Sequence, residues 1–597
     1  MSIKKWVLSN EDISLSNILA QECGISDFVS EILMNRGYKT FEKASQFVEN
    51  ADEIASPLDM VDMKEAVNRI QKAIENCEKV AIYGDYDCDG ITSTSMLYMY
   101  FQTIGLDVIY YIPERDGEGY GLNNSAIDFL SQQNVNLIVT VDNGISANKQ
   151  VEYAKKLGID MVITDHHQPS EEIPNACAVV DPHRKDCKSV FKNLCGAGVA
   201  FKLIATLEGD VNAVLESFGD IVAVGTIGDV VPLVSENRSL VKYGIKMLKL
   251  TDNLGLKALI KVAGLDVSKL TARDVAFMLV PRINAAGRMG SASKAVELLT
   301  CENEQTAEKL ALELDMLNRK RKEEEQQILS DISSILIKKP DALNQRVLMF
   351  YNENWSHGII GIICSKLVEI YGKPVIMMTK DDDIIKGSAR SIGEFNMFNA
   401  LNSTAEFLIQ YGGHKGAGGF SLLPENLVNF KIHMQQYAKN KFDKMPCFEY
   451  FIDKKLRPDE ITVESIKSLD VLEPFGCEND QPLFLIANAV IERITPLSND
   501  KHLKITLNFD GQKIDALYFG MQSKNFNFSV TSRVSVLCYA DINDYNQNLS
   551  VSLKIKDIRP YGFVQNKFFT AKSYYEKIKN NEPVEKNIIR ESTPSRG

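Results

Sequence analysis

One stretch of the sequence decides the fold: VAIYGDYDCDG, residues 80–90. Its first four residues are apolar, as in a strand that is buried on both faces. Three aspartates, Asp85, Asp87 and Asp89, follow at once, and a helical pattern then runs from Ile91 to Ile104. A buried strand that leads through a polar turn into a helix is typical of a βαβ unit, so we expect a parallel sheet here.

The same rhythm continues along the next 100 residues. Apolar runs at 108–112, 137–141, 161–164 and 178–180 are separated by amphipathic helical patterns. Strands that alternate with helices imply right-handed crossovers, because other connections rarely pack back onto a twisted sheet. The sequence therefore predicts an α/β protein with a mostly parallel, doubly wound sheet.

Beyond this region the pattern changes three times. A helical period spans Glu302 to Lys338, and its all-polar centre at 318–327 is typical of a solvated span between domains. A second α/β pattern covers 346–445. After Phe451, short apolar or alternating runs at 503–509, 514–519, 534–539 and 549–555 are predicted strands, and Asp510-Gly511 is a hairpin signal. Such a run of short strands predicts a small antiparallel barrel similar to an OB-fold.

We therefore expect a multidomain chain. The predicted parts are an N-terminal helical segment (1–50), a parallel-sheet domain (51–301), a connecting helix (302–340), a smaller α/β domain (341–450), an OB-like β-barrel (451–562) and a flexible tail (563–597).

Composition excludes several classes of protein. The 597 residues are 45% hydrophobic and 24% charged, which argues against a disordered, collagen-like or disulfide-scaffold protein. The net charge of −12 excludes a uniformly basic DNA-coating protein, but an enzyme on nucleic acid needs only a local positive groove and bound cations. Eleven cysteines, with no signal-peptide core and no long apolar run, predict a cytoplasmic protein with reduced thiols and no membrane segment.

Acidic and imidazole side chains follow the predicted strands. After the aspartates at 85–89 come Asp142, then Asp165-His166-His167, and Asp229 after an apolar stretch from residue 221. One aspartate at a strand end is most often a helix cap. This many carboxylates at one edge of a sheet would repel each other unless cations neutralised them. The set therefore predicts a metal centre at that edge.

The ligand types indicate which metal and which chemistry. Carboxylate oxygens with imidazole, and without thiolates, suit Mn²⁺ or Mg²⁺, and the number of ligands is sufficient for two ions. Two neighbouring ions can clamp a phosphoryl group and activate a water. Cys177, His183, Cys187 and Cys195 have no common zinc-finger spacing, so we expect scattered thiols there.

These motifs resemble the DHH phosphoesterase superfamily and, within it, the RecJ family of single-strand-specific 5′→3′ exonucleases. The resemblance rests on DYDCDG (85–90), VDNG (141–144), DHH (165–167) and GDVVPL (228–233), and it continues in PRINAAGRMG (281–290), GSARS (387–391) and GGHKGAGGF (412–420). It covers nearly the whole chain. It implies a DHH catalytic domain, a DHHA1 domain and a C-terminal OB-fold.

The resemblance also implies roles for individual residues. Asp87 and Asp142 would hold one ion, and Asp142 would bridge to a second ion held with three further ligands. Those three are Asp89, His166 and Asp229. Asp85 would be a ligand or a base beside the ligands, and His167 would face the scissile phosphate.

Further residues are assigned to the substrate by the same resemblance. Arg288 would grip a phosphate near the metals. Ser388, Arg390 and Arg115 would form the pocket for the 5′-terminal phosphate, and His414 would contact the substrate across a cleft. Arginine suits these roles because its planar fork matches phosphate oxygens.

The expected function is a metal-dependent exonuclease that hydrolyses single-stranded DNA from the 5′ end to 5′-mononucleotides, in DNA repair and recombination. The OB-like barrel fits it, because such barrels bind single strands by base stacking and a basic groove. We expect a monomer that works with a helicase and a single-strand-binding protein. The alternatives are a DHH phosphodiesterase for short oligonucleotides or cyclic dinucleotides, and a catalytically inactive DNA-binding scaffold.

Overall fold

The computed structural model describes residues 4–9, 14–49, 54–115, 117–119, 121–442, 444–545 and 548–579. The chain divides into two compact units. The parallel-sheet unit comprises Glu42–Lys322 and Val471–Gln481. The barrel unit comprises Met1–Phe41, Glu323–Asp470 and Pro482–Gly597.

A five-stranded sheet forms the centre of the parallel-sheet unit. Its strands are β2 (Lys79–Tyr83), β3 (Asp107–Tyr111), β4 (Leu137–Val141), β5 (Asp160–Thr164) and β6 (Ala178–Val180). They lie in the order β3-β2-β4-β5-β6, and every neighbouring pair is parallel. The predicted parallel sheet is confirmed.

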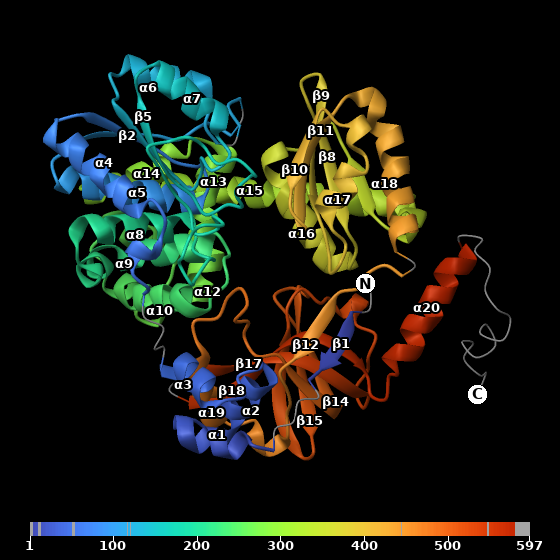
Figure 1. The fold of residues 1–597 in the computed structure, drawn as a ribbon. Coiled ribbons are helices and arrows are strands. Elements are labelled where there is room, and N and C mark those ends of the chain that lie inside the picture. The colour runs from blue at the N-terminus through green and yellow to red at the C-terminus, as the bar shows by residue number, and fades with distance from the viewer. Residues whose placement is uncertain are drawn as a thin grey trace. The chain divides into compact units, whose positions relative to one another are not determined.

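Helices cover both faces of this sheet, as Figure 1 shows. Val80 and Ile82 point into a core shared with helices α4, α5, α8 and α9, whereas Ala81 and Tyr83 point into a second core with α6 and α7. The helices of this unit include α4 (Met63–Glu75), α5 (Cys88–Thr103), α6 (Asn124–Gln132), α7 (Asn148–Lys156), α8 (Gly196–Glu208), α9 (Val211–Gly228), α10 (Ser235–Leu250), α11 (Leu254–Ala263), α13 (Val280–Met289) and α14 (Ser293–Thr300). The apolar run of each strand is thus explained by burial on both sides, and the sheet is doubly wound.

Helix α9 is apolar because it is a core helix. By length and composition alone it could cross a membrane, but 61% of it is buried inside the parallel-sheet unit. It ends at Gly228, so Asp229 follows a helix. The expectation that every acidic motif follows a strand is therefore wrong for Asp229, whose preceding apolar run is as suitable for a buried helix as for a strand.

The long helix α15 (Glu304–Lys338) is present, but its polar centre is not uniformly solvated. Asn318 is 1% exposed and Glu325 is 2% exposed. Asn318 accepts a hydrogen bond from Arg321, and Glu325 forms an ion pair with Lys366 of the barrel unit. Buried charged side chains are tolerated only where they are paired, and that pairing cannot be seen in the local sequence.

A mixed sheet makes up the smaller α/β part of the barrel unit. Its strands are β7 (Leu348–Tyr351), β8 (Val375–Asp381), β9 (Ile384–Arg390), β10 (Gln410–Gly413) and β11 (Ala417–Leu422), in the order β10-β11-β9-β8-β7. Only β7 and β8 are parallel. The helices beside it are α16 (His357–Tyr371), α17 (Met397–Asn402) and α18 (Leu427–Lys441).

A six-stranded sheet of the barrel unit closes into the predicted barrel. Its strands are β13 (Lys454–Lys455), β14 (Phe484–Leu497), β15 (His502–Phe509), β16 (Gln512–Tyr518), β17 (Arg533–Tyr545) and β18 (Asn548–Pro560), with the short helix α19 (Val463–Lys467) nearby. Strand β14 pairs with β15 and with β17, which closes the sheet. The turn at Asp510 and Gly511 has positive φ at both residues, as a two-residue hairpin requires.

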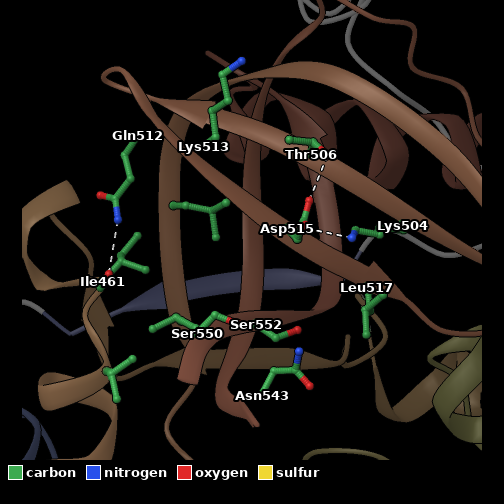
Figure 2. Close-up of a pocket in the computed structure, with 13 residues that line it drawn as sticks. Ile461, Lys504, Thr506, Gln512, Lys513, Asp515, Leu517, Asn543, Ser550 and Ser552 are labelled. Carbon is green, nitrogen blue, oxygen red and sulfur yellow. Dashed lines mark hydrogen bonds and ion pairs between the residues drawn. The ribbon is translucent and has the colours of Figure 1, made fainter. Parts of the chain in front are cut away.

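The barrel opens where β16 meets β18. These two strands pair only at Ala516–Leu553 and Leu517–Lys554, and a cleft of about 540 Å³ lies beside that short ladder. Figure 2 shows Asp515 in this cleft, held by Thr506 and Lys504. Most of the side chains that line the cleft are polar. The apolar ones are Ile461, Val463, Ile514, Leu517 and Val551.

The chain ends differ from expectation. The N-terminal segment contains helices α1 (Ser16–Cys23), α2 (Asp27–Asn35) and α3 (Phe41–Glu49), but it begins with strand β1 (Lys5–Leu8). Strand β1 pairs in parallel with β12 (Glu449–Ile452), 444 residues further along. In the tail that was expected to be flexible, Gln565–Lys579 form helix α20, and 580–597 lie outside the described residues.

Candidate metal centre

The first acidic loop, residues 85–89, is shaped by the start of helix α5. Asp87 is the N-cap of this helix, and its carboxylate accepts hydrogen bonds from the backbone N–H groups of Asp89 (2.9 Å) and Gly90 (3.2 Å). A Cβ at Gly90 would lie 2.5 Å from the carbonyl oxygen of Asp85, so only glycine permits this tight turn. The helix-cap interpretation is therefore correct for Asp87, and it does not prevent the same carboxylate from facing the cluster.

The N-terminus of helix α8 holds Asp89 in place. The Asp89 carboxylate accepts from the backbone N–H of Gly196 at 2.6 Å and of Ala197 at 2.8 Å. A Cβ at Gly196 would lie 2.6 Å from the Cβ of Asp142. The helix start thus packs directly against two carboxylates, where its N–H groups and dipole favour negative charge.

The His166 imidazole lies among three carboxylates. Its Nε2 is 3.0 Å from Asp142 Oδ1 and 3.6 Å from the nearest oxygens of Asp89 and Asp229. The ligand atoms of Asp89, His166 and Asp229 all lie within 4.8 Å of one another, as do those of Asp85, Asp87 and Asp142. Each of these two groups offers enough oxygen and nitrogen atoms for one cation.

Burial raises the proton affinity of these carboxyl groups. Desolvation, with the charge of Asp87 adjacent, raises the pKa of Asp89 to about 7. Desolvation and the neighbouring charge of Asp89 raise the pKa of Asp229 to about 9, and the same causes raise the pKa of Asp142 well above its ordinary value. Carboxylates that resist ionisation to this extent are stabilised as anions when a divalent cation binds.

The two histidines have opposite electrostatic surroundings. Desolvation and the charge of His167 lower the pKa of His166 to about 3, so His166 is a neutral imidazole of the kind that binds metals. Burial by itself would lower the pKa of His167, but a hydrogen bond to Asp165 raises it to about 9. His167 is therefore the protonated member of the pair at neutral pH.

Asp165 holds the segment that carries the two histidines. It is 1% exposed, and its carboxylate accepts from the backbone N–H groups of Ile145, His166 and His167. In the sequence, Asp165 is recognised as part of the DHH motif, but no role is assigned to it. Its position two residues before His167, directly after a strand, is the signal that could have identified it as the residue that orients the imidazole.

Helix α13 lies against the first acidic loop. Asn284 accepts a hydrogen bond from the backbone N–H of Cys88 at 2.8 Å, and a Cβ at Gly287 would lie 2.1 Å from the carbonyl oxygen of Tyr86. This close contact brings Arg288, at the end of the helix, to the same region. Desolvation and the charge of Arg115 lower the pKa of Arg288 to about 10.

Arg115 belongs to the parallel-sheet unit and lies near the acidic loop. Its guanidinium carbon is 5.2 Å from the ring centre of Tyr86, and its Nε is buried without a hydrogen-bond partner in the described part of the chain. The structure therefore brings Arg115 together with Arg288.

Ser388 and Arg390 lie side by side on strand β9 of the barrel unit. The Arg390 guanidinium donates to the Ser388 hydroxyl at 3.4 Å and to the carbonyl of Ala389 at 2.9 Å. A Cβ at Gly361 of helix α16 would lie 3.0 Å from the Ser388 hydroxyl, so this face of the strand packs closely on the helix. Arg115 and this pair are thus on different units.

His414 lies in a hairpin turn rather than in a loop. Gly412 and Gly413 belong to β10, Gly418 and Gly419 belong to β11, and Gly412 pairs with Gly419. The His414 side chain is exposed, and its Nδ1 accepts a hydrogen bond from the N–H of Gly416 at 3.2 Å. The glycine-rich segment 412–420 therefore forms a β-hairpin, in which strands β10 and β11 pair with each other.

Three family models match the chain. They are the DHH family, N-terminal domain (residues 79–226), the DHHA1 domain (344–440) and the RecJ OB domain (452–557). The DHH match includes the acidic loop and both histidines.

Proteins of known name match over most of the chain. The single-stranded-DNA-specific exonuclease RecJ of Bacillus subtilis is 37% identical over 93% of this chain and 70% of its own length. RecJ of Escherichia coli is 33% identical over 83% of this chain and 90% of its own. The crystal structure of RecJ with Mn²⁺ from Thermus thermophilus is similar with a TM-score of 0.81 and 27% identity, over 94% of this chain and 80% of that one. On this evidence the chain belongs to the RecJ family, with DHH, DHHA1 and RecJ OB domains in that order.

Proposed function

We propose that this protein is a metal-dependent exonuclease specific for single-stranded DNA, and that it works from the 5′ end and releases 5′-mononucleotides. The observation that carries the proposal is the grouping of five aspartates and His166 at one edge of the sheet, within a chain 37% identical to a named single-stranded-DNA-specific exonuclease. An inactive scaffold has no use for so many buried carboxyl groups with raised pKa values, which weaken the fold unless a cation binds.

The residues fit two divalent cations, Mn²⁺ or Mg²⁺. Asp85 Oδ1 is buried and has no hydrogen-bond partner within the described ranges, as is expected of a ligand or of a group beside one. Asp87 and Asp142 would hold one ion, with Asp85 next to them. Asp89, His166 and Asp229 would hold the other, with Asp142 shared. When bound, the ions supply charge stabilisation at phosphate oxygens and a water of lowered pKa.

The other residues bind and orient the substrate. His167 is protonated and held through Nδ1, so it can donate a proton or a hydrogen bond to a phosphate oxygen. Arg288 would bind the phosphate next to the metals. Arg390 and Ser388, with Arg115, would bind the 5′-terminal phosphate, and His414 would contact the strand.

The OB barrel supports single-strand binding, because such barrels present aromatic and basic side chains to unpaired bases. An exonuclease restricted to single strands needs a source of them. We therefore propose a helicase and a single-strand-binding protein as partners in repair and recombination. The eleven free cysteines agree with work in the reducing cytoplasm. We propose that the protein acts there as a monomer.

End-blocked substrates test this function. Labelled single strands carrying a block at the 5′ or the 3′ end are incubated with and without Mn²⁺, beside the matching duplex. We expect Mn²⁺-dependent loss of the strand blocked at its 3′ end only, with mononucleotide products. Digestion of the 5′-blocked strand instead, or of the duplex at an equal rate, would contradict the proposal.

A further inference from the structure

A loop from the C-terminal half of the chain is built into the parallel-sheet unit. Residues Val471–Gln481, here named the clasp loop, belong to that unit, whereas the residues on either side of them belong to the barrel unit. Asn479 is 3% exposed and closes the loop, because its amide donates to the carbonyls of Leu472 and Pro474, both at 2.8 Å. The clasp loop is thus an ordered loop with its own hydrogen bonds rather than an extended linker.

Arg238 anchors the clasp loop. This arginine lies in the first turn of helix α10 and is 1% exposed. Its guanidinium donates to the carbonyls of Val471 (3.0 Å) and Glu473 (2.9 Å), and on its other side to that of Phe47 (2.7 Å). A buried charge that is held by backbone carbonyls fixes the position of the segments it joins.

The clasp loop also holds the segment that leads away from Asp229. The backbone N–H of Leu233 donates to the carbonyl of Cys477 at 2.8 Å. Gly476 lies against the same residue, because a Cβ there would be 2.5 Å from Leu233 Cδ1 and 3.0 Å from its Cγ. Leu233 is 3% exposed. Its backbone and its side chain are therefore both set by the clasp loop.

The segment between Asp229 and Leu233 is strained. Val230 has φ of +62°, a conformation that β-branched residues rarely adopt, and the residue is 67% exposed, so burial of Val230 does not account for it. Such a conformation persists only where the surrounding structure imposes it. Val230 lies between the Gly228 end of helix α9 on one side and Leu233, held by the clasp loop, on the other.

We propose that the clasp loop is a positioning element for the Asp229 carboxylate: by fixing Leu233 it maintains the turn at Val230 and sets Asp229 beside His166 for cation binding. This inference rests on the proposed role of Asp229 as a metal ligand. Residues that orient a ligand typically change metal affinity ten- to a hundredfold when they are altered. Gly476 and Asn479 are the positioning residues that this geometry identifies.

The test measures Mn²⁺ binding to the full chain by calorimetry, without DNA. In Gly476→Ala the new methyl group displaces Leu233, and we expect Mn²⁺ affinity to fall roughly tenfold or more. Gly219→Ala, in helix α9, is the matched control. The three atoms nearest to its Cβ would be side-chain atoms of Met247, Tyr243 and Leu215, at 3.3–3.6 Å. We expect this control to bind Mn²⁺ as the parent does, even if its Tm falls.

A second substitution provides a rescue. Leu233→Ala removes the atoms that the new Cβ would strike, so Gly476→Ala with Leu233→Ala should bind Mn²⁺ more tightly than Gly476→Ala does. If Gly476→Ala does not fold, Asn479→Ala carries the test, because it loosens the clasp loop without a clash and should weaken Mn²⁺ binding severalfold. Unchanged Mn²⁺ affinity in the folded variant, with or without a lowered Tm, overturns the proposal.

Asp229→Asn separates this inference from the proposed function. If Asp229→Asn binds Mn²⁺ as tightly as the parent, the ligand assignment itself has failed. If Asp229→Asn loses affinity but neither clasp-loop variant does, the metal centre stands and the clasp loop has no positioning role.

Discussion

His167 Nδ1 lies 2.7 Å from Oδ1 of Asp165, a carboxylate that is 1% exposed and that also accepts three backbone N–H groups. The backbone bonds fix the carboxylate, and the carboxylate fixes the imidazole and its charge. His167 is thereby held as a cation beside a cluster of acidic groups, next to the neutral His166.

The first prediction concerns this pair. Asp165→Asn keeps the shape of the side chain but removes the charge that holds the proton on His167. We expect kcat on single-stranded DNA to fall roughly a hundredfold, a usual effect of losing an oriented acid, with KM little changed. Steady-state kinetics at saturating Mn²⁺ check this. An unchanged kcat would show that the charge of His167 does not contribute to the reaction.

The second prediction concerns Asp142, which is proposed to be shared by both ions. Asp142→Ala should abolish hydrolysis, because Asp142 groups with Asp85 and Asp87 and its Oδ1 also lies 3.0 Å from His166 Nε2 of the other ligand group. It also removes one of several crowded carboxyl groups, so the Tm of the metal-free protein should hold or rise. Differential scanning calorimetry with and without Mn²⁺, beside an activity assay, measures both effects. Near-normal activity at saturating Mn²⁺ would refute the two-ion assignment.

The third prediction concerns recognition of the 5′ end by Arg390 and Ser388. A terminal phosphate has more charge and more free oxygens than an internal one, so an arginine fork beside a hydroxyl can distinguish it. Charge-assisted hydrogen bonds contribute about 1.5–3 kcal/mol. Arg390→Ala should therefore lose roughly ten- to a hundredfold of the preference for 5′-phosphorylated over 5′-hydroxyl strands.

The control for this prediction is Arg288→Ala, which should slow both strands alike because it is proposed to bind a phosphate at the metals. The ratio of initial rates on the two strands is measured for each variant. If Arg390→Ala keeps the ratio of the parent protein, the 5′ end is recognised elsewhere.

The fourth prediction concerns pH and Asp181, which is 0% exposed. Asp181 accepts from the N–H of His183 at 2.6 Å, whereas its Oδ2 is buried without a partner in the ranges described. Burial raises the pKa of Asp181 to about 7. Because the folded pKa lies above the unfolded value of about 3.9, ionisation costs stability as pH rises from about 4 to 7, and the cost is complete above 7.

Asp181→Asn cannot ionise and so escapes this cost. As the pH rises from about 4 to 7, its free energy of unfolding minus that of the parent should increase by up to about 1.4 kcal/mol per pH unit. Above pH 7 the difference should stay level. Urea denaturation at pH 5, 6, 7 and 8 measures the difference. A difference that stays constant across this range would mean that Asp181 does not titrate there.

Much of the fold could be predicted from local patterns. The strands of the parallel sheet were visible because both of their faces are buried, so each is a continuous apolar run. Strands β15 and β18 were visible because one face of each is buried and the residues alternate. Strand β14 was missed, although it is the longest strand described. Its register shifts near Ile486 and Ile491, and each shift interrupts the alternation that identifies a strand.

Local patterns predict the position of the site residues that follow strands, but not the position of Asp229. Asp87, Asp89, Asp142 and His166 follow strands, and the carboxyl ends of parallel strands meet at one edge by topology alone. Asp229 follows helix α9, so its arrival at 3.6 Å from His166 depends on how that helix packs on the sheet. Resemblance to a family makes Asp229 a candidate ligand, whereas the apolar pattern before it predicts a strand where the structure has a helix.

By itself, the sequence determined the sheet, the barrel and the chemical nature of the site, because these follow from the period of apolar residues and from the choice of ligand atoms. Only the tertiary structure decided which distant segments meet. Strand β1 pairs with strand β12. In the polar centre of helix α15, Asn318 and Glu325 are buried. The clasp loop binds Leu233 across more than 200 residues of chain. These contacts are made by backbone N–H and carbonyl groups or by paired charges. Every residue carries the same backbone groups, so nothing in the local sequence indicates which of them will be joined.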